Sequence, residues 1–420
     1  MRDAKLKINV AVAIELLAAF IIRIVYILNT SVYERGHDVG AYTSLLDGQI
    51  NPGHLGYIEY IVKFGTLPKI NPFSLFSYYH PPLHHLLAAI VVKISLLSGA
   101  SYEIAFENIQ LLVCFYGMLS IMLIYLILKE LFGLNPMILV ALLLVSFHPT
   151  FIYMSAYINN DMLTFLFEVL CIYFTVLYIK DRRLKYLILM ALSIGLGMCV
   201  KISVIMMAIP IGIVLLYYLV MDIKAKNYLK TIGEYLIFGI ISISTGLSWT
   251  IRNLIMFSQK PGIASATSED IKYMGNTPLI QRLMMPTNWG MEYPFFSEYG
   301  KDSTNVWLIM FRTAIFGEMR PDLSEAGLFL ARLAFIVSTA LGLMLSVIFI
   351  IKCICYIKEK TNQTLIYVFL LTGFATIVFS YIAFVIKYPY TCSCDFRYIN
   401  IILVYLSIAI MMIKGYGKED

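Results

Sequence analysis

The sequence predicts an all-α polytopic membrane protein with about ten or eleven transmembrane helices. Three observations support this class. Hydrophobic residues make up 60% of the 420 residues and charged residues only 14%, whereas soluble domains carry about 25% charged residues. Apolar stretches of about 20 residues, long enough to span a bilayer, recur along the chain. The connections between many of them are short and basic, as the positive-inside rule expects of cytoplasmic loops.

The apolar stretches fall at residues 8–28, 81–98, 107–128, 136–154, 161–179, 184–199, 203–221, 232–255, 327–352, 364–386 and 398–414. The first follows a basic flank and is too long for the hydrophobic region of a signal peptide. We therefore expect a transmembrane helix whose N-terminal end is cytoplasmic. The basic connections are expected on the same side: 129–130, 180–185, 224–230, 352–360 and 414–418.

The stretch 81–98 does not fit this assignment if it crosses the membrane, because every later basic loop would then face outward. It begins with Pro81-Pro82 and carries Lys93 in its middle, which suits an interfacial helix with one polar face. His84 and His85 are then expected to pack or snorkel at the interface. The result is ten crossings with both termini cytoplasmic, and eleven crossings is the alternative.

This topology gives one domain, residues 1–420, with two large outer regions at residues 29–106 and 256–326. The first is a long outer loop that carries interfacial helices. The second is rich in Pro, Gly, Ser and Asn, so we expect mostly loop with short helices. Residues 306–316 are amphipathic and too short to span.

Composition also excludes some functions. The net charge of +6 does not indicate nucleic-acid binding, because the basic residues lie in the short loops. The seven cysteines and six histidines lack the spacing of a zinc site, and no metal site is predicted. Phosphate-binding glycine loops and dinucleotide motifs are absent from the sequence.

Ionisable and amide side chains gather at the outer ends of the predicted helices. Uncompensated charges at membrane depth cost about 2.5–3.5 kcal/mol each on insertion scales, so they tend to pair or to mark a substrate path. The candidate site residues are Asp38, Tyr79 and His80 in the first outer loop, Asn160 and Asp161 in a tight turn, Lys201 in the next outer turn, and Arg252 and Arg397 at helix ends.

Each charged candidate also has an ordinary structural interpretation. Asp161 could cap a helix, Lys201 could snorkel from a turn, Arg252 could be an interface anchor, and Asp38 could be solvated. As a group, three cations and two carboxylates at one membrane edge suit a substrate with a phosphate and a reacting hydroxyl. A carboxylate in apolar surroundings is a plausible general base.

These residues resemble the GT-C superfamily of membrane glycosyltransferases, most closely its protein-O-mannosyltransferase and aminoarabinose-transferase-like branch. The resemblance covers nearly the full chain, in motifs that are weak singly and more specific in this order. The motifs are His37-Asp38, Tyr79-His80-Pro81-Pro82-Leu83, residues 155–161 (SAYINND), Lys201, residues 249–254 (WTIRNL) with Lys260-Pro261, Phe311-Arg312-Thr313 with Phe316-Gly317, and residues 395–398 (DFRY).

The resemblance implies an inverting transferase that moves a sugar from a polyprenyl-phosphate donor to a hydroxyl acceptor at the extracytoplasmic face. Asp38 would be the general base, and Asp161 would orient the acceptor or a cation near the phosphate. Lys201 and Arg252 would hold the lipid phosphate, with Arg397 as a secondary candidate. His80 would line the substrate cleft.

One departure from the family pattern concerns the first loop. Many relatives have two adjacent acids there, whereas here Asp38 is followed by Val39. A second catalytic role for Asp161 or for Glu34 therefore stays open.

Two other functions share this pattern. A flippase or other transporter of polyprenyl-linked glycans is the non-enzymatic alternative, although transporters often show inverted repeats and helices broken at the midplane. A polymerase or ligase that consumes whole lipid-linked oligosaccharides would use similar site chemistry. We expect no required cofactor, with a divalent cation possible but not predicted. The acceptor is a protein, lipid or glycan hydroxyl, the protein lies among membrane lipids, and the expected location is a prokaryotic plasma membrane.

Overall fold

The computed structural model describes residues 2–34, 36–38, 51–260, 273–284, 295, 304–319 and 321–413. Within these ranges the regular secondary structure is helical, apart from one isolated bridge between Tyr273 and Tyr390. The predicted all-α class is confirmed.

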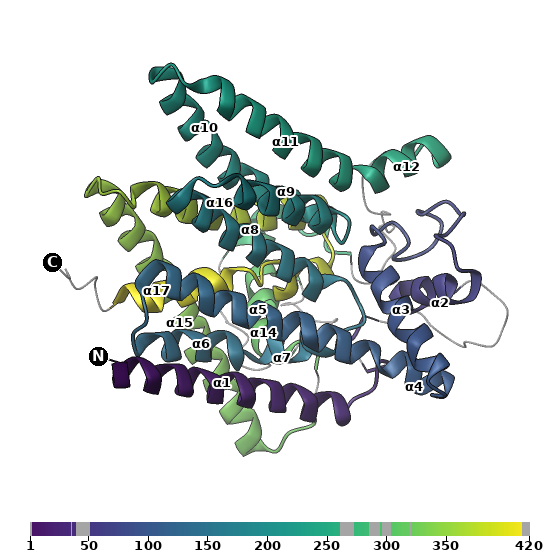
Figure 1. Ribbon diagram of the computed structural model, residues 1–420. Helices are drawn as coiled ribbons and strands as arrows, with labels where there is room; N and C mark the ends of the chain where they lie inside the picture. The colour runs from purple at the N-terminus through teal and green to yellow at the C-terminus, as the bar shows by residue number, and fades with distance from the viewer. Residues whose placement is uncertain are drawn as a thin grey trace.

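Six helices of the described chain are long and apolar enough to cross a membrane. They are α1 (Arg2–Leu28), α5 (Ile109–Phe132, continuing the short α4, Tyr102–Glu107), α8 (Asp161–Asp181), α10 (Ala208–Lys224, preceded by a 3₁₀ turn), α15 (Glu325–Lys358) and α16 (Thr364–Lys387). α1 and α10 lie at opposite edges of the molecule (Figure 1), and buried apolar side chains from these six helices and from the shorter ones form one core cluster.

Two bent pairs of helices each have the length and composition of a further span. α6 (Met137–Ser146) and α7 (Pro149–Tyr153) meet at 62°, and α11 (Tyr228–Gly246) and α12 (Ser248–Phe257) meet at 47°. Pro149 lacks a backbone N–H and so cannot continue α6. The fully buried guanidinium of Arg23 supplies hydrogen bonds to polar groups around the first bend. It donates to the Ser146 carbonyl (2.8 Å) and to Ser155 Oγ (3.0 Å).

The expected ten or eleven crossings include two helices that are shorter than a full span. α9 (Leu184–Met198) has 15 residues and α17 (Ile402–Ile413) has 12, so length and composition support six spans, or eight if each bent pair is one span. Both are short because the adjoining turns, around Lys201 and around Arg397, are not α-helical.

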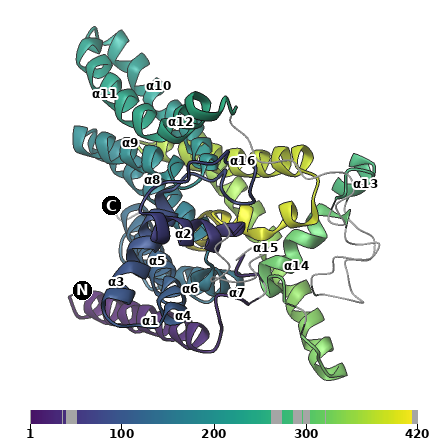
Figure 2. The same cartoon turned by 90° about the vertical axis from the view of Figure 1, so that its right-hand side faces the viewer.

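The first outer loop forms a cap at one end of the bundle. Its helices are α2 (Gly53–Phe64) and α3 (Leu83–Leu97). The start of α1 and the end of α17 lie at the opposite end (Figure 1), and Figure 2 views the capped end directly. α3 has only 15 residues and packs against α2, as the interfacial assignment of 81–98 requires. Two short helices, α13 (Leu279–Leu283) and α14 (Val306–Phe316), lie in the second outer region.

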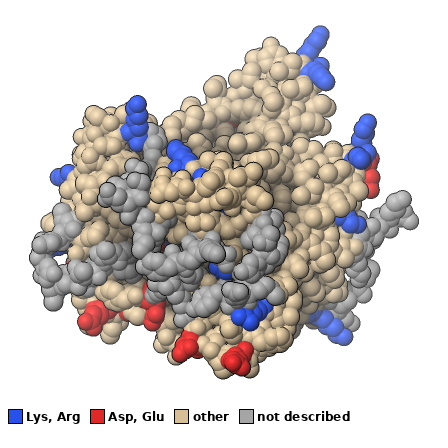
Figure 3. Space-filling view, turned by 180° about the vertical axis from the view of Figure 1, so that it is seen from behind, with Lys and Arg blue, Asp and Glu red and all other residues tan. Residues whose placement is uncertain are grey.

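The surface has the character of a membrane protein. The face seen from behind is largely without charged side chains (Figure 3), and large apolar side chains such as Ile240 and Phe379 are mostly exposed on spans. α10 and α11 lie at the upper edge of the molecule (Figures 1 and 2), where α11 packs against α9 and α10 against α16. α9 packs on α11 at Gly195, where a Cβ would lie only 1.8 Å from Thr245 Oγ1.

Candidate functional site

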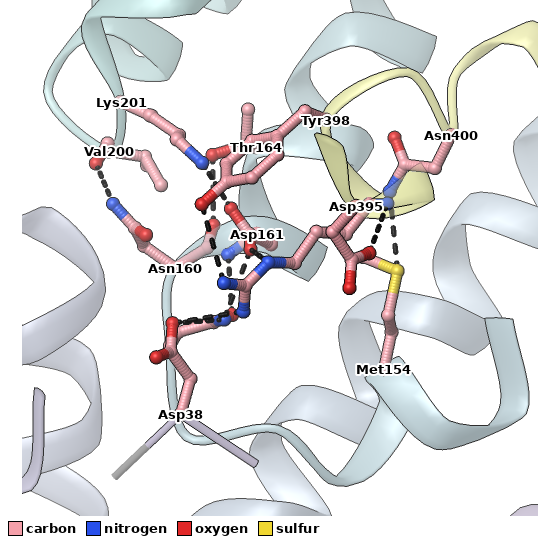
Figure 4. Close-up of polar contacts among 12 residues, drawn as sticks. Asp38, Met154, Asn160, Asp161, Thr164, Val200, Lys201, Asp395, Tyr398 and Asn400 are labelled. Atoms are coloured by element: carbon pink, nitrogen blue, oxygen red, sulfur yellow. Dashed lines mark hydrogen bonds and ion pairs between the residues drawn. The ribbon is translucent and has the colours of Figure 1, made fainter. Parts of the chain in front are cut away.

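Four segments that are distant in sequence meet beneath the capped end of the bundle. Asp38 comes from the first outer loop, Asp161 opens α8, Lys201 lies in the turn after α9, and Arg397 lies in the 3₁₀ turn Phe396–Tyr398 before α17 (Figure 4). We call these four residues the charged cluster. The sequence prediction that these groups converge is confirmed by their contacts.

Arg397 is the centre of the charged cluster. Its Nη1 lies 3.0 Å from Asp38 Oδ2, and its Nε lies 3.7 Å from Asp161 Oδ2. The backbone places it there because the Asp395 side chain accepts a 2.8 Å bond from the Arg397 N–H and so begins the 3₁₀ turn. The Arg397 side chain is only 7% exposed, and a guanidinium is the cation best suited to bridge two carboxylates.

Lys201 supplies the second cation. Its ammonium pairs with Asp161 Oδ1 and lies 4.6 Å from the centre of the Tyr398 ring. Residue 201 is extended and directly precedes a 3₁₀ turn, so the side chain leaves the turn toward α8. The alternative in which Lys201 merely snorkels is not what the structure shows, since its side chain is only 16% exposed.

The Asn-Asn-Asp turn fixes the start of α8. Asn159 donates from Nδ2 to both Asp38 Oδ2 (3.1 Å) and Asp161 Oδ2 (3.0 Å). Asn160 donates to the Val200 carbonyl (2.6 Å) and so ties this turn to the segment that carries Lys201. The N-cap residue of α8 is Asn160, which makes no side-chain capping bond, and Asp161 is the first helical residue. Its oxygens serve the charged cluster, so the interpretation of Asp161 as a simple helix cap is wrong.

Asp38 is held through one oxygen. Its contacts with Arg397, with Asn159 and with His54 (3.8 Å from Nε2) all fall on Oδ2. No contact from the described residues falls on Oδ1, and the side chain is 24% exposed. The residue has a φ of 63°, a left-handed conformation that Asp tolerates better than most residues.

The electrostatic environment keeps Asp38 ionised. Burial alone would raise the pKa of this carboxyl, but Arg397, His54 and the Asn159 hydrogen bond together lower it below its ordinary value. Asp395, in contrast, has its pKa raised to about 7 by burial, against the opposing effect of Arg397. Two carboxyls near the same guanidinium therefore differ in protonation at neutral pH.

A set of aromatic and imidazole rings forms the wall beside Asp38. The His54 ring stacks on His80 (centroids 5.1 Å apart), and His80 lies against Tyr79 (4.6 Å). Burial lowers the pKa of His54 to about 4, so its imidazole is neutral at neutral pH. His80 thus lies near Asp38, as expected of a residue lining the cleft.

Two further histidines lie inside the cap. His84 and His85 are fully buried, so of the two expected roles they pack and do not snorkel. His84 donates to the Ile158 carbonyl (2.9 Å), and His85 Nε2 lies 3.0 Å from His54 Nδ1. Both imidazoles find polar partners inside the cap, so they need not reach the interface.

Arg252 lies outside the charged cluster. Its guanidinium donates to the Pro68 carbonyl (2.6 Å) and to Asn253 Oδ1 (2.9 Å), and it stacks 4.6 Å from the Trp249 ring. These contacts fasten α12 to the first outer loop, together with the 3.3 Å bond from Trp249 Nε1 to the Tyr79 carbonyl. The structure thus joins Arg397, not Arg252, to Lys201.

Sequence reasoning missed His54 as a site residue, and it named Asn159 and Tyr398 only as parts of motifs. An available signal for His54 was its position in the same outer loop as Asp38. Within the described residues, no group of three or more His, Cys, Asp or Glu side chains could hold a metal ion. Among the described residues, the cations of the charged cluster are Lys201 and Arg397.

Comparisons with known proteins agree with this architecture. Residues 79–249 match the family model described as dolichyl-phosphate-mannose-protein mannosyltransferase. No curated protein matches the chain in sequence. The matched segment contains Asp161 and Lys201 but neither Asp38 nor Arg397.

Three solved structures are similar to this one. The apo oligosaccharyltransferase of Archaeoglobus fulgidus matches with a TM-score of 0.54 at 12% identity, over 94% of this chain and 49% of that chain. The same archaeal enzyme, AglB, in complex with an inhibitory peptide and a dolichol-phosphate, matches with a TM-score of 0.50 at 13% identity, with the same coverage. ArnT from Cupriavidus metallidurans bound to undecaprenyl phosphate matches with a TM-score of 0.41 at 14% identity, over 97% of this chain and 77% of that chain.

The chain therefore spans about half the length of the archaeal oligosaccharyltransferase and shares its membrane fold. The family match and the fold together support the resemblance to the GT-C superfamily.

Proposed function

We propose that this chain, whose family match and fold are those of GT-C membrane glycosyltransferases, is an inverting glycosyltransferase that uses a polyprenyl-phosphate sugar. The acceptor in this proposal is a hydroxyl group of a protein, lipid or glycan. The dolichol-phosphate in the AglB complex supports a lipid-phosphate donor for the shared fold. One observation carries the proposal: the Asp38 carboxylate pairs with the buried Arg397 through Oδ2 alone among the described residues, and Arg397 also faces Asp161, the partner of Lys201.

Asp38 is the general base in this mechanism. Its Oδ1 takes the proton of the acceptor hydroxyl as the acceptor oxygen bonds to the sugar's C1. The bond from C1 to the phosphate oxygen breaks on the opposite face, and its electron pair leaves with the lipid phosphate. The configuration at C1 inverts because attack and departure occur on opposite faces.

Lys201 and Arg397 stabilise the leaving phosphate. Charge develops on this group as the bond to the sugar breaks, and cations already in place need little reorganisation to stabilise it. Arg397 takes the role that the sequence assigned first to Arg252, because only Arg397 lies beside both carboxylates. Losing one such contact typically lowers the rate about 10²–10³-fold.

We also propose that the reaction needs no divalent cation. Lys201 and Arg397 already pair with Asp38 and Asp161, the carboxylates that a metal ion would otherwise bind. Chelation with EDTA should leave the transfer rate unchanged, and restoration of a lost rate by Mg²⁺ or Mn²⁺ would contradict this.

The orientation of the protein follows from the basic loops. The capped end is opposite the two helix ends expected in the cytoplasm, so we place the charged cluster on the extracytoplasmic face of a prokaryotic plasma membrane. Cysteine labelling from outside intact cells, at a position introduced in α2 and at one introduced in the loop after α8, tests this. Only the first should react with an impermeant reagent.

A transfer assay with purified protein in detergent tests the proposed function. Radiolabelled polyprenyl-phosphate sugars, hexose and pentose, are offered with a membrane extract as the source of acceptor, and release of free sugar to water is measured too. Asp38→Asn should abolish turnover because an amide cannot act as the base. The loop should keep its conformation, since Asn also tolerates the left-handed backbone. Asp222→Asn, at an exposed ion pair with Arg182, is the matched control and should keep full activity. Donor binding without any turnover in wild type would favour a lipid transporter.

A further inference from the structure

His54 lies between Asp38 and a second buried imidazole. It opens α2, and its Nε2 lies 3.8 Å from Asp38 Oδ2, while its Nδ1 lies 3.0 Å from His85 Nε2. His54 is 2% exposed and His85 is fully buried. A carboxylate and two imidazoles therefore stand in line, and the proposed mechanism has not used either ring.

The hydrogen-bonding capacity of His85 decides which nitrogen of His54 carries the proton. His85 Nδ1 is buried and makes no hydrogen bond within the described residues. The Pro81 carbonyl acts on this ring as a backbone hydrogen-bond acceptor that opposes the lowering of its pKa, but its contact does not reach the geometry of a hydrogen bond to Nδ1. A buried N–H without a partner is rarer than an unused acceptor, so His85 carries its proton on Nε2.

That proton is donated to His54 Nδ1, which must then be the acceptor. A neutral imidazole has one N–H, and burial lowers the pKa of both His54 and His85 below the ordinary value. His54 consequently carries its proton on Nε2, the nitrogen that faces the Asp38 carboxylate. The chain of donors runs from His85 through His54 toward Asp38.

Stacking rings hold this pair in place. Tyr57 lies 4.1 Å from the His85 ring and Tyr78 lies 4.8 Å from Tyr57, both nearly parallel. His80 stacks on the other side of His54. Neither imidazole can turn without disturbing this packing, so the donor aimed at Asp38 is fixed before any substrate binds.

We propose that His54 is a positioning residue for Asp38 and that His85 sets its tautomer. The inference rests on the proposed function. Its reason lies in the double use of Arg397, which holds Asp38 Oδ2 in this structure and would also bind the donor phosphate. When the guanidinium turns toward the phosphate, Asp38 keeps the weaker, neutral hold of His54 and Asn159, and Oδ1 stays directed at the acceptor.

The chemistry of this arrangement is simple. The acceptor O–H bond breaks and a new O–H bond forms at Asp38 Oδ1, while His54 keeps its own proton on Nε2, 3.8 Å from Oδ2. When the donor is bound, the Arg397 guanidinium also faces the phosphate and stabilises the ionised form of Asp38 less. The Asp38 carboxylate then becomes a stronger base. Base strength and donor occupancy are thereby coupled.

Two measurements test the inference, and the first does not depend on activity. The chain has six histidines, so ¹⁵N-histidine NMR of the detergent-solubilised protein, assigned with single His→Gln variants, can identify the tautomer of His54. We expect protonated Nε2 in wild type and a loss of that preference in His85→Phe, which keeps the stacking on Tyr57 but removes the donor. A wild-type His54 protonated on Nδ1 would overturn the inference whatever the enzyme does.

The second measurement is turnover of the radiolabelled polyprenyl-phosphate sugars by variants. His54→Ala should lower kcat about 10²-fold, the usual effect of a small misplacement of a catalytic group, with the donor KM unchanged. His54→Gln, whose amide can donate from nearly the same place, should recover much of the rate. His84→Gln is the control, since His84 bonds to the Ile158 carbonyl and does not contact Asp38.

The outcomes separate the two proposals. Full kcat in His54→Ala, together with loss of turnover in Asp38→Asn, would refute the positioning role and leave the transferase standing. Equal losses in His54→Ala and His54→Gln, with unchanged melting temperatures, would also refute it. Turnover that survives in Asp38→Asn would overturn the proposed base and with it this inference.

Discussion

Replacing Arg397 by Met removes the cation that bridges two carboxylates and leaves a side chain of similar length. Breaking a buried ion pair by deleting one partner typically costs about 3–5 kcal/mol. Asp161 keeps Lys201 as a partner, and Asp38 is 24% exposed, so the lower end applies. We expect Arg397→Met to lower the free energy of unfolding by about 3 kcal/mol.

The matched control for this change is Arg182→Met. Arg182 also pairs with a carboxylate, Asp222, at 2.6 Å, but its side chain is 37% exposed. Exposed pairs contribute about 0–1 kcal/mol, so this variant should be nearly as stable as wild type. Reversible denaturant unfolding in detergent, followed by circular dichroism, compares the two variants directly.

A double variant tests whether the loss arises at the carboxylate. Asp38→Asn in the Arg397→Met background removes a charge that has lost its partner, so the two changes should cost less together than in sum. Residues in direct contact show coupling of about 0.5–3 kcal/mol, and at 3.0 Å we expect about 1–2 kcal/mol. Strictly additive losses, or an Arg397→Met protein as stable as Arg182→Met, would refute the bridging role.

Four further predictions concern binding, pH and packing. Lys201→Met should lower kcat/KM for the donor about 10²–10³-fold, and an unchanged kcat/KM would remove Lys201 from the phosphate site. Burial raises the pKa of Asp395 to about 7, and its ionised form should compete with the donor for Arg397, so the donor KM should rise as the pH passes above 7. Asp395→Asn keeps the side-chain cap of the 3₁₀ turn and should flatten this profile. An identical rise of KM in both proteins would exclude Asp395 as the competing group. The same raised pKa predicts that, as the pH rises from about 4 to 7, the free energy of unfolding of wild type falls relative to that of Asp395→Asn. The reason is that Asp395 ionises in the unfolded chain but stays protonated in the folded one over this range. Gly195→Ala should destabilise the α9–α11 contact by about 1–3 kcal/mol, whereas Gly212→Ala, with open space around it, should be neutral or slightly stabilising; equal melting temperatures for the two would show that the contact can relax.

Charges in apolar surroundings were the most predictable part of the site. Asp161 and Lys201 interrupt long apolar stretches, so their cost at membrane depth marks them in the sequence. Their mutual pairing is also expected, because both lie in turns at the same end of neighbouring helices. Arg397 stands out for the same reason, although its central position between the carboxylates depends on a 3₁₀ turn that apolar periodicity does not encode.

The role of Arg252 was harder to predict because it depends on a bend. The apolar stretch 232–255 reads as one straight helix that would carry Arg252 to the end of a span. In the structure the helix breaks at Leu247, and α12 turns by 47°. The Arg252 side chain consequently meets the Pro68 carbonyl of the first outer loop.

His54 could not be found from local pattern. Its neighbours in residues 51–64 are a mixture of polar and apolar residues, so a histidine there gives no contrast. Its significance comes from His85, 31 positions later, and from Asp38, 16 positions earlier. Contacts between loop elements of this kind follow from tertiary packing, which composition and periodicity do not specify.

The wide sequence separation of the charged cluster affects biogenesis. Asp38 and Asp161 are synthesised long before Arg397, which is 359 positions from Asp38. Until the ribosome has passed that codon, the inserted chain has helices in the bilayer but an acidic, unfinished centre. Nascent chains stalled before residue 397 should therefore be substrates for membrane quality control, even though nearly all their spans have been inserted.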